Sequence, residues 1–365
     1  MKICIVLPSL GLGGIEKVSQ NLADFLSKKN SVTILTLDSD NQKIYFPNNI
    51  RILSCNNKKL FFSLKTMFFI LKNERFDLVI SNSNHINIIV YLLSFIINYK
   101  NICIEHGSIL NSLLNLNSIK KFIYTYLIKF FYVFNRNIIF VSEGVYNDFR
   151  KINPKFKKNI IYNSFDLNKI RDLSRCKIPN DTLSEDGDNI IYVGRLSKEK
   201  NLMLLFRAFN QIQLGKNIKL IILGEGPCKT EIYNFAKENN FLSKVVFLNY
   251  QDNPYKFISK SSMLVLSSLT EGLPTVLVES LICGTPVVST NCPHGPAEIL
   301  NNGMYGILVE NNNLESLIEG INNMLKNYDY WKSLDYGSLL INFDINNISE
   351  QYNSFILKSI EAENI

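Results

Sequence analysis

The sequence predicts an α/β protein in which two Rossmann-like domains follow one another. First, β-type and helical segments alternate along both halves of the chain, which is typical of doubly wound parallel sheets. Second, 365 residues exceed one comfortable α/β core and favour two domains of roughly 170 residues each. Third, residues 174–188 are polar and aperiodic, as expected of a linker.

The first predicted domain spans residues 1–173. Its short apolar runs are expected to be buried parallel strands, because strands covered on both faces are almost continuously apolar. These runs are Lys2–Pro8, Val32–Leu37, Asp77–Ser81, Asn101–Glu105 and Asn137–Val141. A helix is predicted over Glu16–Lys28, where Val18, Leu22 and Leu26 recur at helical spacing.

The second predicted domain spans residues 189–340 and repeats the alternation. Its predicted strands are Ile190–Val193, Ile218–Leu223, Val245–Leu248, Met263–Leu266, Pro286–Ser289 and Gly306–Val309. Residues 341–365 are predicted to form a C-terminal helix that packs back on the first domain. Because two such units commonly bind ligands between them, the cleft between the domains is the expected ligand site.

Charge is distributed unevenly along the chain. Residues 1–175 hold 24 Lys and Arg against 11 Asp and Glu, a net charge of +13, whereas residues 176–365 hold 15 against 21, a net charge of −6. This asymmetry indicates that the first half faces an anionic partner. A membrane surface and nucleic acid are both candidates, and the lack of a nucleic-acid-binding motif disfavours the second.

Cysteine spacing and hydropathy indicate the cellular compartment in which the protein is expected. The seven cysteines are odd in number and contain no C-x-x-C pair, which disfavours disulfides and structural zinc and favours reduced cytosolic thiols. The opening segment lacks a signal-peptide pattern. The longest apolar stretch, Ile86–Ile97, is shorter than the ~20 residues that cross a bilayer. We therefore expect a soluble or peripheral protein.

The first candidate binding segment is the glycine-rich loop between the first strand and the first helix. Gly13 and Gly14 would let the backbone approach a ligand, and the helix start behind them attracts an anion. The spacing is not that of the dinucleotide motif, because Glu16 stands where the last glycine is required. A plain tight turn remains the alternative.

The second candidate segment follows the first strand of the second domain. Gly194, Arg195 and Lys200 lie there, at the carboxyl end of a strand, where α/β sheets bind ligands. Two fixed cations can neutralise a diphosphate leaving group, as Mg²⁺ does elsewhere. A solvated basic loop is the alternative.

The third candidate segment is 268–280. Pro274 suits the first turn of a helix, so that the N–H groups of Val276, Leu277 and Val278 are expected to be free. Glu279 would lie roughly 7 Å along this helix, about the offset between a diphosphate and its ribose. Glu271 precedes the helix and can reach sugar hydroxyls.

Together these segments resemble the large retaining glycosyltransferase family 4, which has the GT-B fold. The resemblance rests on the Glu-x₇-Glu pattern of Glu271 and Glu279, on Val193-Gly-Arg-Leu, on Gly224-Glu-Gly-Pro and on Glu105-His106-Gly107. It covers nearly the whole chain. The stretch Asn291–Leu300 resembles bacterial O-antigen, capsule and lipid-linked oligosaccharide members, although Ala297 stands where those often carry an arginine. No role is assigned to His294.

The resemblance implies a role for each candidate residue. Gly13 and Gly14 would pack on the donor diphosphate, and Arg195 and Lys200 would bind its phosphates. Glu271 would contact the donor sugar, and Glu279 would hold the ribose. His106 would lie near the sugar's C6 hydroxyl and the reaction centre, with a structural histidine as the alternative. The remaining donor-binding residues would be Gly194, Gly272, Leu273, Pro274, Leu277 and Val278.

The resemblance also implies the reaction. A sugar would pass from UDP-hexose or UDP-N-acetylhexosamine to a lipid-linked saccharide of a bacterial surface polysaccharide, without a metal or other cofactor and with retention of configuration. The metal-motif look-alike Asp38-Ser-Asp40 is expected to be an unrelated loop. The alternatives are a nucleotide-sugar epimerase on the same fold and an NAD-dependent oxidoreductase, for which the glycine spacing fails.

Two segments could explain the basic first half. Residues 58–69 and 120–132 mix lysines with aromatic residues at helical spacing, which is the composition of a helix at a membrane interface. We therefore expect peripheral attachment to the inner face of the cytoplasmic membrane. Burial of these residues in the core is the alternative.

Overall fold

A computed structural model describes residues 1–11, 13–38, 44–56, 60–107, 118–152, 154, 157–178, 183, 187–212 and 217–361. The chain forms two compact units, Met1–Phe165 with Asp344–Ile365, and Asp166–Phe343. The first crossing therefore follows Phe165, and the predicted linker, 174–188, falls within the second unit. The C-terminal helix α16 (Ile345–Glu361) belongs to the first unit.

The first unit contains a six-stranded sheet of parallel strands in the order β3-β2-β1-β4-β5-β6. The strands are β1 (Lys2–Ser9), β2 (Ser31–Asp38), β3 (Arg51–Ser54), β4 (Leu78–Asn82), β5 (Lys100–Glu105) and β6 (Ile138–Phe140). The sequence analysis missed β3. This edge strand has only four residues and none of them is fully buried, so it lacks the apolar run that marks its neighbours.

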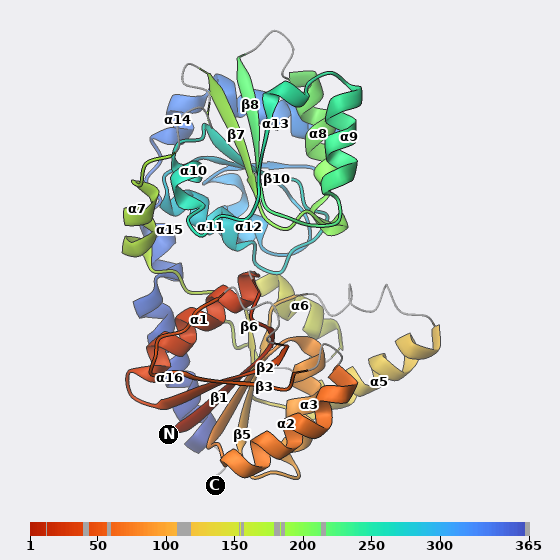
Figure 1. Cartoon of the computed structure of the whole chain (residues 1–365), viewed down its shortest axis with the longest axis vertical. Helices are drawn as coiled ribbons and strands as arrows, with labels where there is room; N and C mark the ends of the chain where they lie inside the picture. Colours follow the sequence, from red (N-terminus) through yellow and green to blue (C-terminus); the bar gives the residue numbers. More distant parts are fainter. Residues whose placement is uncertain are drawn as a thin grey trace. The chain divides into compact units, whose positions relative to one another are not determined.

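Helices cover both faces of this sheet (Figure 1). They are α1 (Gly14–Ser27), α2 (Leu60–Glu74), α3 (Asn84–Ser94), α5 (Ser118–Phe134), α6 (Glu143–Ile152) and α16. On one face, Met67 of α2 and Val90 of α3 pack with Val6 and Val79 of the strands in one buried cluster. This burial holds the two helices against the sheet.

The second unit contains another six-stranded parallel sheet, in the order β12-β11-β10-β7-β8-β9. The strands are β7 (Asp188–Val193), β8 (Ile218–Leu223), β9 (Val245–Leu248), β10 (Met263–Leu266), β11 (Val287–Thr290) and β12 (Ile307–Val309). The predicted α/β class with two parallel sheets is confirmed.

The helices of the second unit are mostly short. They are α7 (Leu167–Ser174), η1 (Lys198–Lys200), α8 (Leu202–Ile212), α9 (Lys229–Glu238), η2 (Leu242–Lys244), α10 (Tyr255–Ser259), α11 (Thr275–Ile282), α12 (Pro296–Ile299), η3 (Asn301–Gly303), α13 (Leu314–Lys326), α14 (Tyr328–Lys332), α15 (Gly337–Leu340) and η4 (Ile341–Phe343). The candidate binding residues of this unit lie within or just before η1 and α11.

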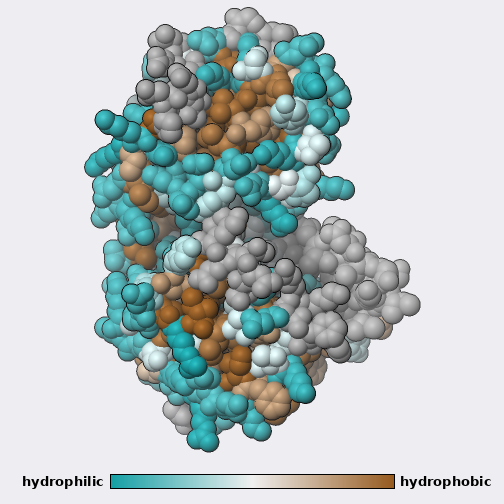
Figure 2. All heavy atoms as spheres, viewed as in Figure 1, coloured by the Kyte–Doolittle hydropathy of each residue, from teal (hydrophilic) through white to brown (hydrophobic). Residues whose placement is uncertain are grey.

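On the face shown in Figure 2, hydrophilic residues cover most of the described surface, and hydrophobic residues reach it in smaller patches. All seven cysteines are free thiols, and five of them are buried. No helix in the described part of the chain combines the length and the apolar character needed to span a bilayer.

Candidate functional site

In the second unit, the candidate residues gather where the strand order reverses. Strands β7 and β10 are neighbours, but the chain leads from β7 to β8 on one side and from β10 to β11 on the other. Ligands of open α/β sheets bind beside the carboxyl ends of the strands at such a point. Arg195 and Lys200 follow β7, and Glu271 follows β10.

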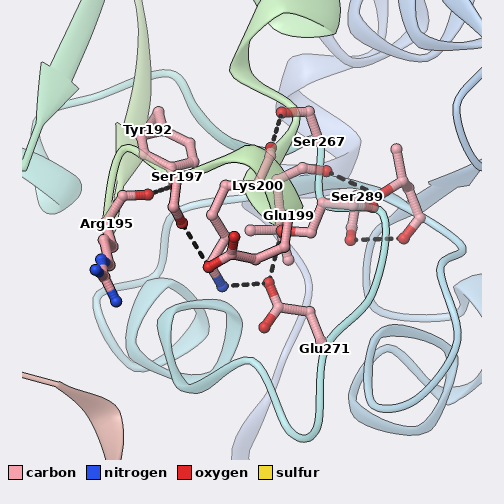
Figure 3. Close-up of polar contacts among 11 residues, drawn as sticks. Tyr192, Arg195, Ser197, Glu199, Lys200, Ser267, Glu271 and Ser289 are labelled. Atoms are coloured by element: carbon pink, nitrogen blue, oxygen red, sulfur yellow. Dashed lines mark hydrogen bonds and ion pairs between the residues drawn. The ribbon is translucent and has the colours of Figure 1, made fainter. Parts of the chain in front are cut away.

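An ion pair joins the two loops at this position. The Nζ atom of Lys200 lies 2.6 Å from Oε1 of Glu271, and the side chains are only 23% and 10% exposed, respectively. The hydroxyl of Ser268 donates to the same carboxylate oxygen at 2.6 Å. Figure 3 shows Lys200 and Glu271 converging from the two loops. A half-buried ammonium group is thus held in place with its charge matched by one carboxylate.

The backbone of the loop after β7 is tied to the loop after β10. The Ser267 hydroxyl donates to the carbonyl of Lys200 at 2.9 Å, and the Leu269 N–H donates to the carbonyl of Glu199 at 2.8 Å. Burial raises the pKa of Glu199, but the hydrogen bond from Ser197, the backbone and the nearby Lys200 and Arg195 outweigh it and lower the pKa overall. The turn that carries Lys200 therefore holds several charged groups in one fixed arrangement.

Arg195 is held differently from Lys200. Its backbone carbonyl accepts a hydrogen bond from the Tyr192 hydroxyl at 2.9 Å, whereas its side chain is exposed. Figure 3 shows that side chain pointing away from the Lys200–Glu271 pair. Within the described residues its guanidinium group has no hydrogen bond or ion pair. The structure thus places the two predicted cations in one loop but pairs only Lys200.

Glycines allow two loops of the second unit to interlock. A Cβ atom on Gly224 would lie 2.0 Å from the carbonyl oxygen of Gly194, and one on Gly226 would lie 2.3 Å from that of Leu196. Both glycines have φ values near +150°. The N–H of Leu196 also donates to the carbonyl of Glu225. The loop after β8 therefore requires glycine at 224 and 226, because the backbone of Gly194 and Leu196 fills the space that a side chain there would need.

Helix α11 corrects one expectation about free N–H groups. The helix begins at Thr275, so Pro274 lies just before it, with ψ of 95°, and not in its first turn. The N–H of Leu277 donates to the Pro274 carbonyl at 3.1 Å, so it is not free for a ligand. The prediction was wrong here because the helix starts one residue later and tightens its first turn.

Glu279 lies within α11 and is 5% exposed. The buried hydroxyl of Tyr255, from α10, donates to its Oε1 atom at 3.3 Å. Leu277 and Val278 beside it are fully buried in the core. A buried carboxylate requires polar partners, and Tyr255 supplies one of them.

A further loop, 293–295, supports Glu271. The sequence analysis assigned no role to this loop. The Glu271 N–H donates to the carbonyl of Pro293 at 3.1 Å. A Cβ atom on Gly295 would lie 2.3 Å from Cδ of Pro274 and 3.1 Å from the carbonyl oxygen of Gly272. Gly295 has a φ value of +92°, which favours glycine. Leu273, between these contacts, is 6% exposed. The loop 293–295 therefore packs directly against residues 272–274.

In the first unit, the side-chain carboxylate of Glu16 lies against the glycine loop. Gly13 precedes α1, and Gly14 is the first residue of that helix. A Cβ atom on Gly13 would lie 2.2 Å from Oε2 of Glu16, and the Ser9 hydroxyl donates to Oε1 of Glu16 at 2.9 Å. Since the φ value of Gly13 is −86°, the glycine makes room for Glu16 and serves no strained turn.

His106 follows β5 in the first unit and is half-buried. Its Nε2 atom lies 3.0 Å from Oδ1 of Asn82, the last residue of β4. Burial lowers the pKa of His106 to about 4, so the imidazole is neutral at pH 7. The sequence analysis missed Asn82. A polar residue that ends a buried apolar run could have indicated it.

For the other positions named in the sequence analysis, the described part of the structure indicates no function. Ala297 lies in α12, and His294 adopts a φ value of +70° in the loop before it. Asp38 ends β2, while Ser39 and Asp40 lie outside the described residues, as do Lys58 and Lys59. Nothing is described of the side chains of Lys120 and Lys121. Among the described residues, no three His, Cys, Asp or Glu side chains come together as a metal site.

The chain matches two family models, one in each half. Residues 12–169 match the model described as Glycosyltransferase Family 4, and residues 175–337 match that described as Glycosyl transferases group 1.

Two relatives are similar over most of their length. The chain is 33% identical over 341 residues to the N-acetylgalactosamine-N,N'-diacetylbacillosaminyl-diphospho-undecaprenol 4-alpha-N-acetylgalactosaminyltransferase of Campylobacter jejuni, covering 89% of this chain and 90% of that one. It is 26% identical over 297 residues to the Escherichia coli O-antigen biosynthesis glycosyltransferase WclY, covering 80% and 81%.

Solved structures share the fold. The sucrose-phosphate synthase of Thermosynechococcus elongatus superposes with a TM-score of 0.85 at 17% identity, over 99% of both chains. Anabaena HepE, in complex with UDP and glucose, superposes with a TM-score of 0.79 at 17% identity, over 98% of this chain and 100% of that one.

Proposed function

Because this chain belongs to glycosyltransferase family 4 and has the GT-B fold, we propose that it transfers a sugar with retention from a UDP-sugar to a lipid-linked saccharide. That it is a glycosyltransferase follows from the family. The proposal concerns the donor, the acceptor and the stereochemistry. The donor would be UDP-hexose or UDP-N-acetylhexosamine, since UDP is the commonest donor nucleotide of the family.

The observation that carries the donor assignment is the Lys200–Glu271 pair at the reversal point of the second sheet. A nucleotide diphosphate gains negative charge as its bond to the sugar breaks. A fixed, half-buried ammonium group stabilises that charge most effectively, because it needs no reorganisation during the reaction. Arg195, exposed in the same loop, can add a second cation. We infer that these cations serve in place of a metal ion.

The two carboxylates of the pattern have separate tasks in this proposal. Glu271 shares its Oε1 atom with Lys200 and Ser268, and its other oxygen can accept from donor-sugar hydroxyls. Glu279 is buried on α11, where it can accept from ribose hydroxyls. A carboxylate that accepts two hydroxyl hydrogen bonds is a known device of nucleotide sites.

Retention requires no protein nucleophile. The acceptor oxygen attacks the anomeric carbon on the face that the phosphate leaves, and the bond from that carbon to the phosphate oxygen breaks. The leaving phosphate accepts the proton of the incoming hydroxyl. Lys200 then stabilises the charge that remains on the diphosphate.

The lipid-linked acceptor is supported by the named substrate of the Campylobacter relative and by the surface of α5. Phe122, Tyr126, Phe130 and Phe134 recur every four residues on this helix and are 50% to 70% exposed. Exposed Lys129 lies on the same helix. An exposed aromatic stripe with a cation suits a membrane interface. We infer that α5 brings the first unit to a polyprenyl-diphosphate-linked sugar at the inner face of the cytoplasmic membrane.

A transfer assay tests the proposed function. The full chain is incubated with each of several UDP-, GDP- and dTDP-sugars and a short synthetic polyprenyl-diphosphate disaccharide, in the presence of excess chelator. We expect one UDP-sugar to extend the acceptor, and the new bond to keep the donor's anomeric configuration. Inversion would contradict the stereochemistry. Activity that disappears with chelator and returns with Mn²⁺ would contradict the metal-independent mechanism.

An assay without the acceptor distinguishes a transferase from a nucleotide-sugar epimerase. A nucleotide-sugar epimerase would convert the donor without any acceptor, whereas a transferase would at most hydrolyse it slowly. Accumulation of an epimeric nucleotide sugar would therefore favour the epimerase.

Membrane attachment is tested by replacing residues of the α5 stripe. The double variant Lys129→Glu/Phe130→Glu should bind anionic vesicles at least fivefold more weakly than wild type, since each cation near such a surface contributes about 1 kcal/mol. Vesicle sedimentation measures the binding. Tyr330→Glu, which alters an exposed aromatic residue of the second unit, is the matched control. Equal binding of all three proteins would contradict docking through α5.

A further inference from the structure

Asn82 and His106 form a polar pair in the first unit at a position where ligands of such sheets bind. Strands β1 and β4 are neighbours, and the chain leads from them to opposite sides, so the strand order reverses between them. Asn82 ends β4, and His106 follows β5, the next strand. The register pairs Asn82 with Ile104, which brings both residues to the same edge of the sheet.

The contact between them determines which ring nitrogen carries the hydrogen. The Oδ1 atom of Asn82 lies 3.0 Å from Nε2 of His106. An amide oxygen only accepts, so Nε2 must be the donor. Burial lowers the pKa of the imidazole to about 4, so the ring carries one hydrogen at neutral pH. Nδ1 therefore presents a lone pair.

The side-chain amides of Asn82 and of its neighbour Asn87 differ in how fully they are hydrogen-bonded. The Nδ2 atom of Asn87 donates to the Ile104 carbonyl at 3.0 Å and to Oε1 of Glu105 at 2.6 Å. The Nδ2 atom of Asn82, in a residue that is 1% exposed, has no hydrogen-bond partner among the described residues. A buried unsatisfied donor costs about 1–3 kcal/mol. The orientation of the Asn82 amide therefore serves the histidine.

We propose that Asn82 is a positioning residue for sugar transfer, because its amide oxygen fixes the Nε2–H tautomer of His106. Nδ1 of His106 then accepts a hydrogen bond from a hydroxyl of the bound sugar. The inference rests on the proposed function for the identity of the substrate. Asn82 itself acts through the histidine.

The tautomer is measured directly by nitrogen NMR of the histidine rings. The chain has only 3 histidines, so His106 is identified by its loss in His106→Gln. We expect Nε2–H in wild type, in Asn82→Asp, which keeps the accepting oxygen, and in the control Ser83→Ala. In Asn82→Leu the preference should be lost. The carboxylate of Asn82→Asp should also raise the pKa of His106 and move the pH profile of kcat upward.

The same variants are then assayed for transfer. Asn82→Leu should lower kcat roughly tenfold, the loss expected for one oriented hydrogen bond, while its affinity for UDP stays that of wild type. An unchanged tautomer in Asn82→Leu would overturn the proposal, and so would a changed tautomer with wild-type kcat. If Asn82→Leu fails to fold, an unchanged pH profile in the isosteric Asn82→Asp overturns it. Absence of transfer by wild type with an intact tautomer would refute the proposed function and leave the tautomer assignment standing.

Discussion

The ligand-binding edges of the two sheets differ in charge and in how their polar groups are held. In the second unit, Lys200 is paired with Glu271, and the loops that carry them are joined by hydrogen bonds to the backbone carbonyls of Glu199 and Lys200. In the first unit, Asn82 and the neutral imidazole of His106 meet without a net charge. A fixed cation suits a diphosphate, and neutral polar groups suit sugar hydroxyls. The difference supports the proposal that the second unit binds the nucleotide and that the first contacts the sugars.

The largest expected effect tests the charged edge. Lys200→Ala removes the ammonium group that stabilises the leaving diphosphate and leaves Glu271 half-buried without its cation. Turnover should fall about a hundredfold to a thousandfold, as for other preorganised groups that stabilise developing charge. Steady-state kinetics measures it. Lys198→Ala, an exposed lysine of the same turn, is the control and should keep wild-type kcat. Comparable losses in both variants would mean that the position of Lys200 is not special.

Replacing Glu279 by Ala should act on nucleotide binding alone. A hydrogen bond to a charged group contributes about 1.5–3 kcal/mol, so UDP should bind roughly tenfold to a hundredfold more weakly. Titration calorimetry gives the affinity, and circular dichroism checks that the fold persists. Undiminished affinity in a folded variant would remove Glu279 from the ribose site.

The variant Tyr255→Phe tests the surroundings of Glu279 with a smaller change. It removes only the hydroxyl that donates to Glu279 at 3.3 Å and keeps the buried ring. Losing one neutral donor to a carboxylate should weaken UDP binding by a few-fold, on the order of 1 kcal/mol. The matched control is Tyr233→Phe, at an exposed tyrosine of α9. Equal affinities for both variants would show that Tyr255 does not orient Glu279.

A test of a different kind concerns the neutral edge and the pH dependence of stability. The pKa of His106 is lowered to about 4 in the folded chain, whereas an unfolded histidine titrates near 6.5. Between these values the unfolded chain binds more protons, so the stability contributed by His106 is full above pH 6.5 and is lost as the pH falls toward 4. Urea unfolding at several pH values measures this loss. His106→Gln should show a weaker dependence, and an unchanged dependence would contradict burial of the ring.

Much of the fold could be predicted from the sequence because the strands are buried and apolar. The strands Ile218–Leu223, Val245–Leu248 and Met263–Leu266 have the predicted bounds. The edge strand Arg51–Ser54 was missed because an edge position requires no apolar run.

The placement of candidate residues could be predicted where they are close in sequence and share one loop, as Arg195 and Lys200 do. Asn82 was missed because its partner, His106, lies 24 residues further along the chain. Only the register of two strands brings them together. The start of α11 was misplaced by one residue, since propensity does not decide whether a proline precedes a helix or opens it.

The central claim, that the second unit holds the donor nucleotide without a metal, is tested most directly by titrating UDP into the wild-type chain and three variants in excess chelator. The account predicts one site in wild type, unchanged in Asn82→Leu and weakened at least tenfold in both Lys200→Ala and Glu279→Ala. Equal affinity in all four proteins, or binding that appears only when Mg²⁺ or Mn²⁺ is restored, would contradict it.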